Sequence, residues 1–75
     1  MAWRVVAIEN PARLSLRDNQ LVITQEMEST LPIEDIDALI LDNYGSTITT
    51  NLLIALATKG TTTVICDEKH LPASV

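Results

Sequence analysis

The chain has 75 residues, of which 47% are hydrophobic and 3% aromatic, and its formal net charge is −5. A domain of this size buries only about 60% of the surface that its unfolded chain exposes, so its stability should be limited. The scarcity of aromatic residues argues against a base-stacking surface, and the negative charge argues against strong binding of nucleic acid by the chain alone.

The first predicted element is a strand over residues 3–9, which are mostly apolar and rich in β-formers. A continuous apolar run of this kind is typical of a strand that is covered on both faces. Asn10-Pro11 ends it, because the residue before proline avoids helical backbone and proline cannot donate to a ladder.

The next predicted element is a β-hairpin with Asp18-Asn19 as a two-residue turn. This turn places Arg17 opposite Gln20, Leu16 opposite Leu21, and Leu14 opposite Ile23. The aliphatic side chains then share one face, and Arg13, Ser15 and Arg17 share the opposite, solvated face. A further short strand is expected over residues 30–33, where Pro32 marks it as an edge strand.

The second half of the chain has a strand-helix-strand pattern. Residues 38–41 form an apolar run that is suited to a buried strand, and residues 62–66 are strand-like again. Between them, Ile48, Leu52, Ala55 and Leu56 recur at helical spacing. We expect Ser46 or Thr47 to cap this helix and Gly60 to end it. The two strands should pair in parallel through a right-handed connection.

These elements predict the α+β class: a small β-rich fold of N-terminal hairpins followed by a β-α-β unit, with one helix packed on a mixed sheet. We see no repeat, linker or low-complexity tract, so residues 1–75 are expected to form a single domain. The single cysteine excludes an internal disulfide and favours a cytoplasmic location. No apolar run approaches the roughly 20 residues of a membrane-spanning helix.

Polar side chains follow the last predicted strand. Asp67, Glu68 and His70 lie after the carboxyl end of a parallel strand, where open α/β sheets bind ligands, and carboxylates with an imidazole could hold a divalent metal. Consecutive residues point in divergent directions, however, and Lys69 opposes a cation, so a solvated strand end is the favoured interpretation. Cys66 could act as a nucleophile with His70 as its base, although a packed thiol is more usual.

A second group of acidic residues is Asp35, Asp37 and Asp42. Asp37 and Asp42 flank a predicted strand at an odd separation, so they face opposite sides and are better suited to capping or turns than to one cation. Arg13 and Arg17 could contact DNA phosphates from the exposed face of the hairpin. A solvated face with two arginines is also common in small domains, and the net acidity of the chain favours that simpler interpretation.

The motifs and their order resemble one known family. They are Trp3-Arg4-Val5-Val6, Arg13-Leu14-Ser15-Leu16, Gln20-Leu21-Val22-Ile23, residues 36–41, residues 47–53 and residues 64–72. Together they are similar to the amino-terminal domain of the CRISPR-associated endonuclease and integrase of spacer acquisition, in its type II form. The last of these motifs is the most specific, and residues 25–29 and 43–46 show no match.

The resemblance implies an inactive assembly domain of a longer protein. In that family the β-rich domain forms a homodimer, a second small CRISPR-associated protein is bound, and double-stranded DNA lies across the assembly. The carboxylates and histidine that bind Mg²⁺ or Mn²⁺ belong to a helical domain, so no catalytic, cofactor-binding or metal-binding residue is carried onto this chain. Arg13 and Arg17 are the candidate DNA contacts. The alternative is a free-standing ligand- or partner-binding module with its site at Asp67 to His70.

Overall fold

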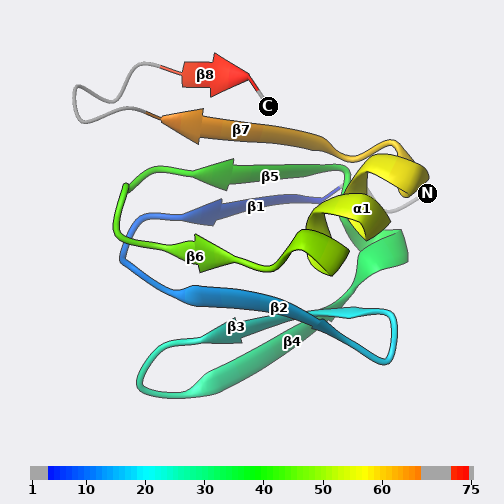
Figure 1. The fold of residues 1–75 in the computed structure, drawn as a ribbon, viewed down its shortest axis with the longest axis horizontal. Helices are drawn as coiled ribbons and strands as arrows, with labels where there is room; N and C mark the ends of the chain where they lie inside the picture. Colours follow the sequence, from blue (N-terminus) through cyan, green and yellow to red (C-terminus); the bar gives the residue numbers. More distant parts are fainter. Residues whose placement is uncertain (1–3, 67–71, 75) are drawn as a thin grey trace.

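The computed structural model describes residues 4–66 and 72–74, with the side chains of residues 4–66. In chain order the elements are β1 (Val5–Ile8), β2 (Arg13–Arg17), β3 (Gln20–Thr24), β4 (Glu28–Pro32), the 3-10 turn η1 (Ile33–Asp35), β5 (Ala38–Leu41), β6 (Thr47–Ile48), α1 (Thr50–Lys59), β7 (Thr62–Cys66) and β8 (Pro72–Ser74). The predicted α+β class is confirmed. The strands divide between two sheets, however, where one mixed sheet was expected (Figure 1).

The first sheet, sheet A, has the strand order β1-β5-β7-β8. Strands β1, β5 and β7 are parallel neighbours, and β8 pairs with β7 in the antiparallel direction. Helix α1 connects β5 to β7 after the chain has passed through β6, so the predicted parallel β-α-β unit is confirmed. The unit lies in a mixed sheet because of the direction of β8.

The second sheet, sheet B, has the strand order β4-β3-β2-β6. Its β2–β3 hairpin has the predicted register, with Arg17 opposite Gln20 and Leu16 opposite Leu21. The turn residues Asp18 and Asn19 have φ angles of 52° and 59°, as the tight turn of a two-residue hairpin requires. Strand β4 is an edge strand, as its proline indicated, although it begins at residue 28 rather than 30.

The two sheets and α1 share one aliphatic core. Leu14 and Leu21 come from sheet B, Leu39 from the middle of sheet A, and Leu52 and Leu56 from the helix, and each is at most 1% exposed. The side chains on these elements recur at strand and helix periods, so each element turns one apolar face to the same interior. The core therefore joins the two halves of the sequence.

The start of the helix differs from the prediction. Thr47 and Ile48 form the short strand β6, which pairs with β2 in the parallel direction, and α1 begins at Thr50 with Thr49 as its N-cap residue. The backbone N–H groups of Thr47 and Thr49 donate to the carbonyl oxygens of Ala12 and Leu14, at 3.0 and 3.1 Å. Thr47 and Ile48 are β-branched and fit a strand well, and their pairing with β2 keeps them out of the helix.

The end of the helix is as predicted. Gly60 has a φ of 92°, and its N–H group lies 3.1 Å from the carbonyl oxygens of both Leu56 and Ala57. This left-handed cap satisfies carbonyl groups that the last helical turn leaves without partners, and glycine adopts it without steric cost.

The prediction that the first strand is covered on both faces was wrong. Strand β1 is the edge of sheet A, with Ile8 buried and Val5 and Ala7 exposed. The apolar residues of β1 belong to two different faces. Val6 and Ile8 face the core, whereas Val5 and Ala7 lie on the outer face of the sheet.

Candidate functional site

The two arginines predicted as DNA contacts lie on the outer face of sheet B. Leu14 and Leu16 of β2 pack in or against the core, so the alternate residues Arg13, Ser15 and Arg17 point the other way. Cross-strand pairing extends this surface over β3 and β4. We call it the polar face of sheet B, and its residues are Arg13, Ser15, Arg17, Gln20, Val22, Thr24, Glu28 and Thr30.

An ion pair crosses this face. The Arg17 Nη2 atom donates to Glu28 Oε2 at 2.8 Å. Arg17 on β2 lies opposite Gln20, the first residue of β3, and Glu28 on β4 lies opposite Thr24, the last residue of β3. The two charged residues therefore flank opposite ends of β3. The ion pair therefore runs diagonally across β3, whose central residue is Val22. Val22 is 3% exposed although it is outside the core cluster, which fits a position beneath this pair.

The ion pair also sets the electrostatics of the polar face of sheet B. Its hydrogen bond and charge raise the pKa of Arg17 and lower the pKa of Glu28 below its ordinary value. The pair therefore persists to a more acidic pH than an unpaired glutamate would allow, and it is lost as pH falls through the lowered pKa. Among the described residues Arg13 forms no ion pair. Two arginines against one glutamate leave this face with one net positive charge on a chain of −5.

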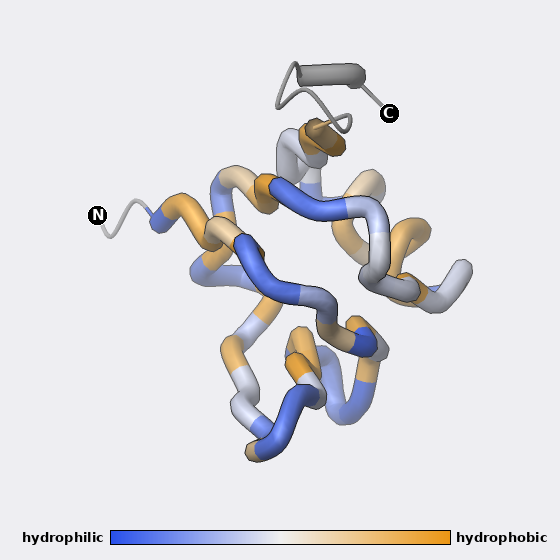
Figure 2. The backbone as a smooth tube through the Cα atoms, turned by 90° about the vertical axis from the view of Figure 1, so that its left-hand side faces the viewer, coloured by the Kyte–Doolittle hydropathy of each residue, from blue (hydrophilic) through white to orange (hydrophobic). Residues whose placement is uncertain are grey.

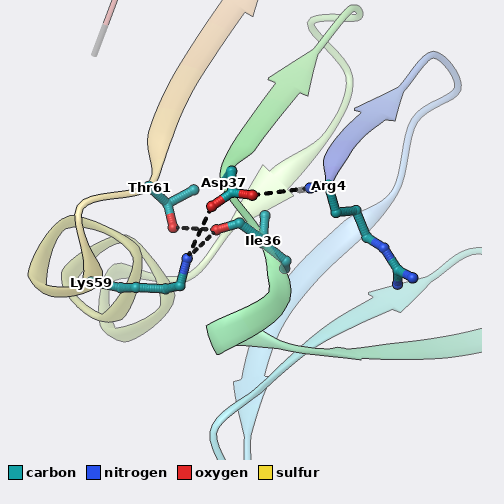
Figure 3. Close-up of polar contacts among 5 residues, drawn as sticks. All are labelled: Arg4, Ile36, Asp37, Lys59 and Thr61. Carbon is teal, nitrogen blue, oxygen red and sulfur yellow. Dashed lines mark hydrogen bonds and ion pairs between the residues drawn. The ribbon is translucent and has the colours of Figure 1, made fainter. Parts of the chain in front are cut away.

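The second group of acidic residues, Asp35, Asp37 and Asp42, does not form one cluster. Asp37 and Asp42 lie beyond opposite ends of β5, and within residues 4–66 and 72–74 no group of three His, Cys, Asp or Glu side chains is placed to hold a metal ion. Asp37 instead has a structural role (Figure 3). Its Oδ2 accepts a hydrogen bond from the Arg4 backbone N–H at 3.0 Å, and its Oδ1 lies 3.7 Å from Lys59 Nζ.

Two further bonds complete this polar cluster around the carbonyl oxygen of Ile36. Lys59 Nζ donates to it at 2.6 Å, and the buried Thr61 hydroxyl donates to it at 2.8 Å. The cluster links the starts of β1, β5 and β7 with the end of α1. Because ligands of open α/β sheets bind at the carboxyl ends of the strands, the location of this cluster at their amino ends fits a structural role.

The candidates at the end of β7 are only partly covered by the structure. Cys66 is half-buried as the last residue of the strand. Asp67, Glu68 and His70 lie outside the described residues, so their predicted roles are not tested. In the described part of the chain no helix is long and apolar enough to span a membrane.

The structure shows a surface feature that the sequence analysis missed. A groove of about 350 Å³ lies beside β1. One side is formed by residues 6–10, from β1 and the loop that follows it, and the other side by Ile23, Gln25 and Ser29 of the β3–β4 region. A hollow of about 690 Å³ adjoins it, lined in addition by Pro11, Glu26 and Met27. Loops at this end of the molecule are largely hydrophilic (Figure 2). No sequence signal could have found the groove, because it combines segments that are 13 or more residues apart.

The fold and this surface define a small α+β domain that presents an arginine-bearing sheet face. The family model described as "CRISPR associated protein Cas1" matches residues 5–74. The chain belongs to the Cas1 family. It is 48% identical over 73 residues to the CRISPR-associated endonuclease Cas1 of Neisseria meningitidis serogroup C, a match that covers 96% of this chain and 24% of that protein. The chain thus spans about a quarter of the length of this relative.

Solved structures share the fold. A Cas1 protein from Thermotoga maritima superimposes with a TM-score of 0.79 at 12% identity, over 95% of this chain and 24% of that one. The TtCas1 protein in its DNA complex gives a TM-score of 0.76 at 24% identity, over 89% of this chain and 25% of that one. At these identities the likeness establishes the architecture of the domain, and it agrees with the two sheets and single helix described above.

Proposed function

We propose that this chain is the amino-terminal assembly domain of a CRISPR-associated integrase, of the type II form that its sequence motifs resemble. The observation that carries the proposal is the family match over residues 5–74, which includes every strand and the helix of the structure. The longer protein would insert foreign DNA into the CRISPR array in the cytoplasm, as part of antiviral defence. In this proposal the domain provides dimerisation, contact with double-stranded DNA and contact with a second small CRISPR-associated protein.

The residues described here do not fit the divalent metal of such an enzyme. The carboxylates nearest to the sheets are separated, and Asp37 is engaged by the Arg4 N–H and Lys59. In this proposal, as the family resemblance implies, Mg²⁺ or Mn²⁺ binding, and the hydrolysis or strand transfer that it supports, belongs to the rest of the longer protein.

Arg13 and Arg17 are the proposed DNA contacts. Both project from the exposed face of β2. They are four residues apart in one strand, which separates their Cα atoms by roughly 13 Å, so they would contact different phosphates of the DNA backbone. Arg13 can meet a phosphate directly, whereas a phosphate must compete with Glu28 for Arg17. Removal of Glu28 should therefore strengthen DNA binding, because it frees Arg17 and removes a negative charge.

This is tested by measuring duplex affinity over a salt series in the full-length protein. Arg13→Gln with Arg17→Gln should weaken binding about 10-fold or more and reduce the slope of log affinity against log salt by up to about 2. Glu28→Gln should tighten binding about 2- to 5-fold. Arg4→Gln is the control, since Arg4 precedes β1 in the other sheet. Equal losses for the Arg4 variant and the double variant, or no effect of either, would exclude this face as a DNA contact.

The proposed homodimer rests on the outer face of sheet A. Parallel sheets are normally covered on both faces. Here the core covers the face that carries Leu39 and Leu41, whereas the alternate residues form an apolar surface that is exposed or half-buried. We call it the outer face of sheet A, and its residues are Val5, Ala7, Ala38, Ile40, Thr62 and Val64. A second copy would remove this surface from water.

Sedimentation of the full-length protein tests the dimer. Ile40→Glu and Val64→Glu place charges on the outer face of sheet A, and each should shift the protein from dimer to monomer at micromolar concentration. Ile54→Glu is the matched control, because Ile54 is 61% exposed on α1, away from this face. A dimer that is unaffected by both sheet variants would show that copies meet elsewhere, without bearing on the DNA contacts.

A further inference from the structure

The free edge of β1 has backbone groups that are available for a further strand. The Ala38 N–H donates to the Arg4 carbonyl at 3.3 Å, and the Asp42 N–H donates to the Ile8 carbonyl at 2.8 Å. Successive residues of a strand direct their N–H and C=O groups to alternate edges, so Val5 and Ala7 direct theirs away from β5. In the described residues no strand pairs with that edge.

This edge opens onto the groove beside β1. The groove has a volume of about 350 Å³ and is bounded on the far side by Ile23, Gln25 and Ser29. Ile23 is half-buried and packs against the core, so it provides an apolar floor. A groove of this size beside unpaired main-chain groups suits an extended peptide, which adds main-chain hydrogen bonds to the sheet and places alternate side chains in the groove.

The charges around the groove indicate the occupant. Glu9 lines the groove and Glu26 lines the adjoining hollow, and no Lys or Arg lines either. A second copy of this acidic surface would bring like charges together, whereas a segment with Lys or Arg beside its apolar residues would complement them. The exposed side chain of Met27, in the adjoining hollow, adds an adaptable apolar contact.

We propose that the β1 edge and its groove bind an extended peptide segment of a different protein, with alternating apolar residues and a basic residue next to Glu9 and Glu26. The segment pairs with the main chain of Val5 and Ala7 and extends sheet A by one strand. This site uses the main-chain edge of Val5 and Ala7, whose side chains belong to the outer face of sheet A, and it is separate from the polar face of sheet B. The pairing needs only the free N–H and C=O groups of that edge, so it requires neither the proposed homodimer nor DNA contact.

The probe is a seven-residue peptide of alternating valine and threonine with a lysine at each end, acetylated and amidated. With the full-length protein we expect saturable binding by fluorescence anisotropy and slower amide hydrogen exchange in residues 5–9. Replacing the lysines with glutamates, or N-methylating the peptide backbone on its pairing edge, should weaken binding at least about 10-fold, because charge complementarity or main-chain pairing is lost.

Two protein variants locate the site. Ala7→Pro removes an N–H that points to the free edge and leaves the bonds to β5 in place, so binding should fall at least about 10-fold. Glu9→Gln with Glu26→Gln changes only exposed side chains and should weaken binding about 3- to 10-fold at low salt. If Ala7→Pro does not fold, the glutamine variant and the modified peptides decide the question.

Three results would overturn the proposal. One is equal binding of the lysine and glutamate peptides, and another is equal binding of the N-methylated and unmodified peptides. The third is concentration-dependent protection of the Val5 and Ala7 amides without peptide that persists in the Ile40→Glu and Val64→Glu variants, which would show that a second copy occupies the edge itself.

Discussion

Leu39→Ala should lower the free energy of unfolding by about 3 kcal/mol, because it leaves a cavity at the centre of the shared core. Leu39 is completely buried on β5, between β1 and β7. A domain of this length has a total stability on the order of 4 to 11 kcal/mol, so the variant should lose a large fraction of it. Urea denaturation followed by circular dichroism gives the measurement.

Ile54→Ala is the control for this cavity. It also removes aliphatic carbons, but Ile54 is 61% exposed on α1, so the change should stay within about 0.5 kcal/mol. Similar midpoints for the two variants would mean that Leu39 is not at the centre of the core.

Asp37→Ala should cost about 1 to 2 kcal/mol, because it leaves the Arg4 N–H without its acceptor and removes the partner of Lys59. The estimate lies at the lower end for bonds to a charged group, since the side chains of Lys59 and Asp37 are 26% and 34% exposed. Asp37→Asn keeps an acceptor oxygen and should cost less. Thermal unfolding of the unchanged protein, Asp37→Asn and Asp37→Ala should give midpoints that fall in that order.

Asp35→Ala is the matched control, since it removes a carboxylate two residues away that forms no hydrogen bond or ion pair with any described residue. The structural role assigned to Asp37 would have to be abandoned if Asp35→Ala and Asp37→Ala were equally destabilising.

Local signals in the sequence were sufficient to predict the turns and helix ends at which one residue type determines the backbone conformation. Asp18-Asn19 accepts the positive φ angles of a two-residue turn, and that turn fixes the whole register of the β2–β3 hairpin. Gly60 ends the helix for a similar reason. The parallel pairing of β5 and β7 followed from the strand-helix-strand order.

Predictions failed where long-range contacts decide the structure. Thr47 and Ile48 suit either a helix start or a strand, and pairing with β2 selects the strand. The exposure of β1 could not be read from its apolar run, since nothing in residues 3–9 says which strand lies beside it. Likewise, Arg13 and Arg17 were correctly placed on one face, but the diagonal pairing of Arg17 with Glu28 depends on the twist and register of three strands.

The path of the chain through β6 couples the two sheets mechanically. The chain leaves sheet A after β5, joins sheet B for two residues, and returns through α1 to β7. A rigid helix therefore has one end anchored in each layer. A load applied to the β2–β3 hairpin would be transmitted along this helix to the neighbouring layer, so the layers should tilt as one body rather than slide independently.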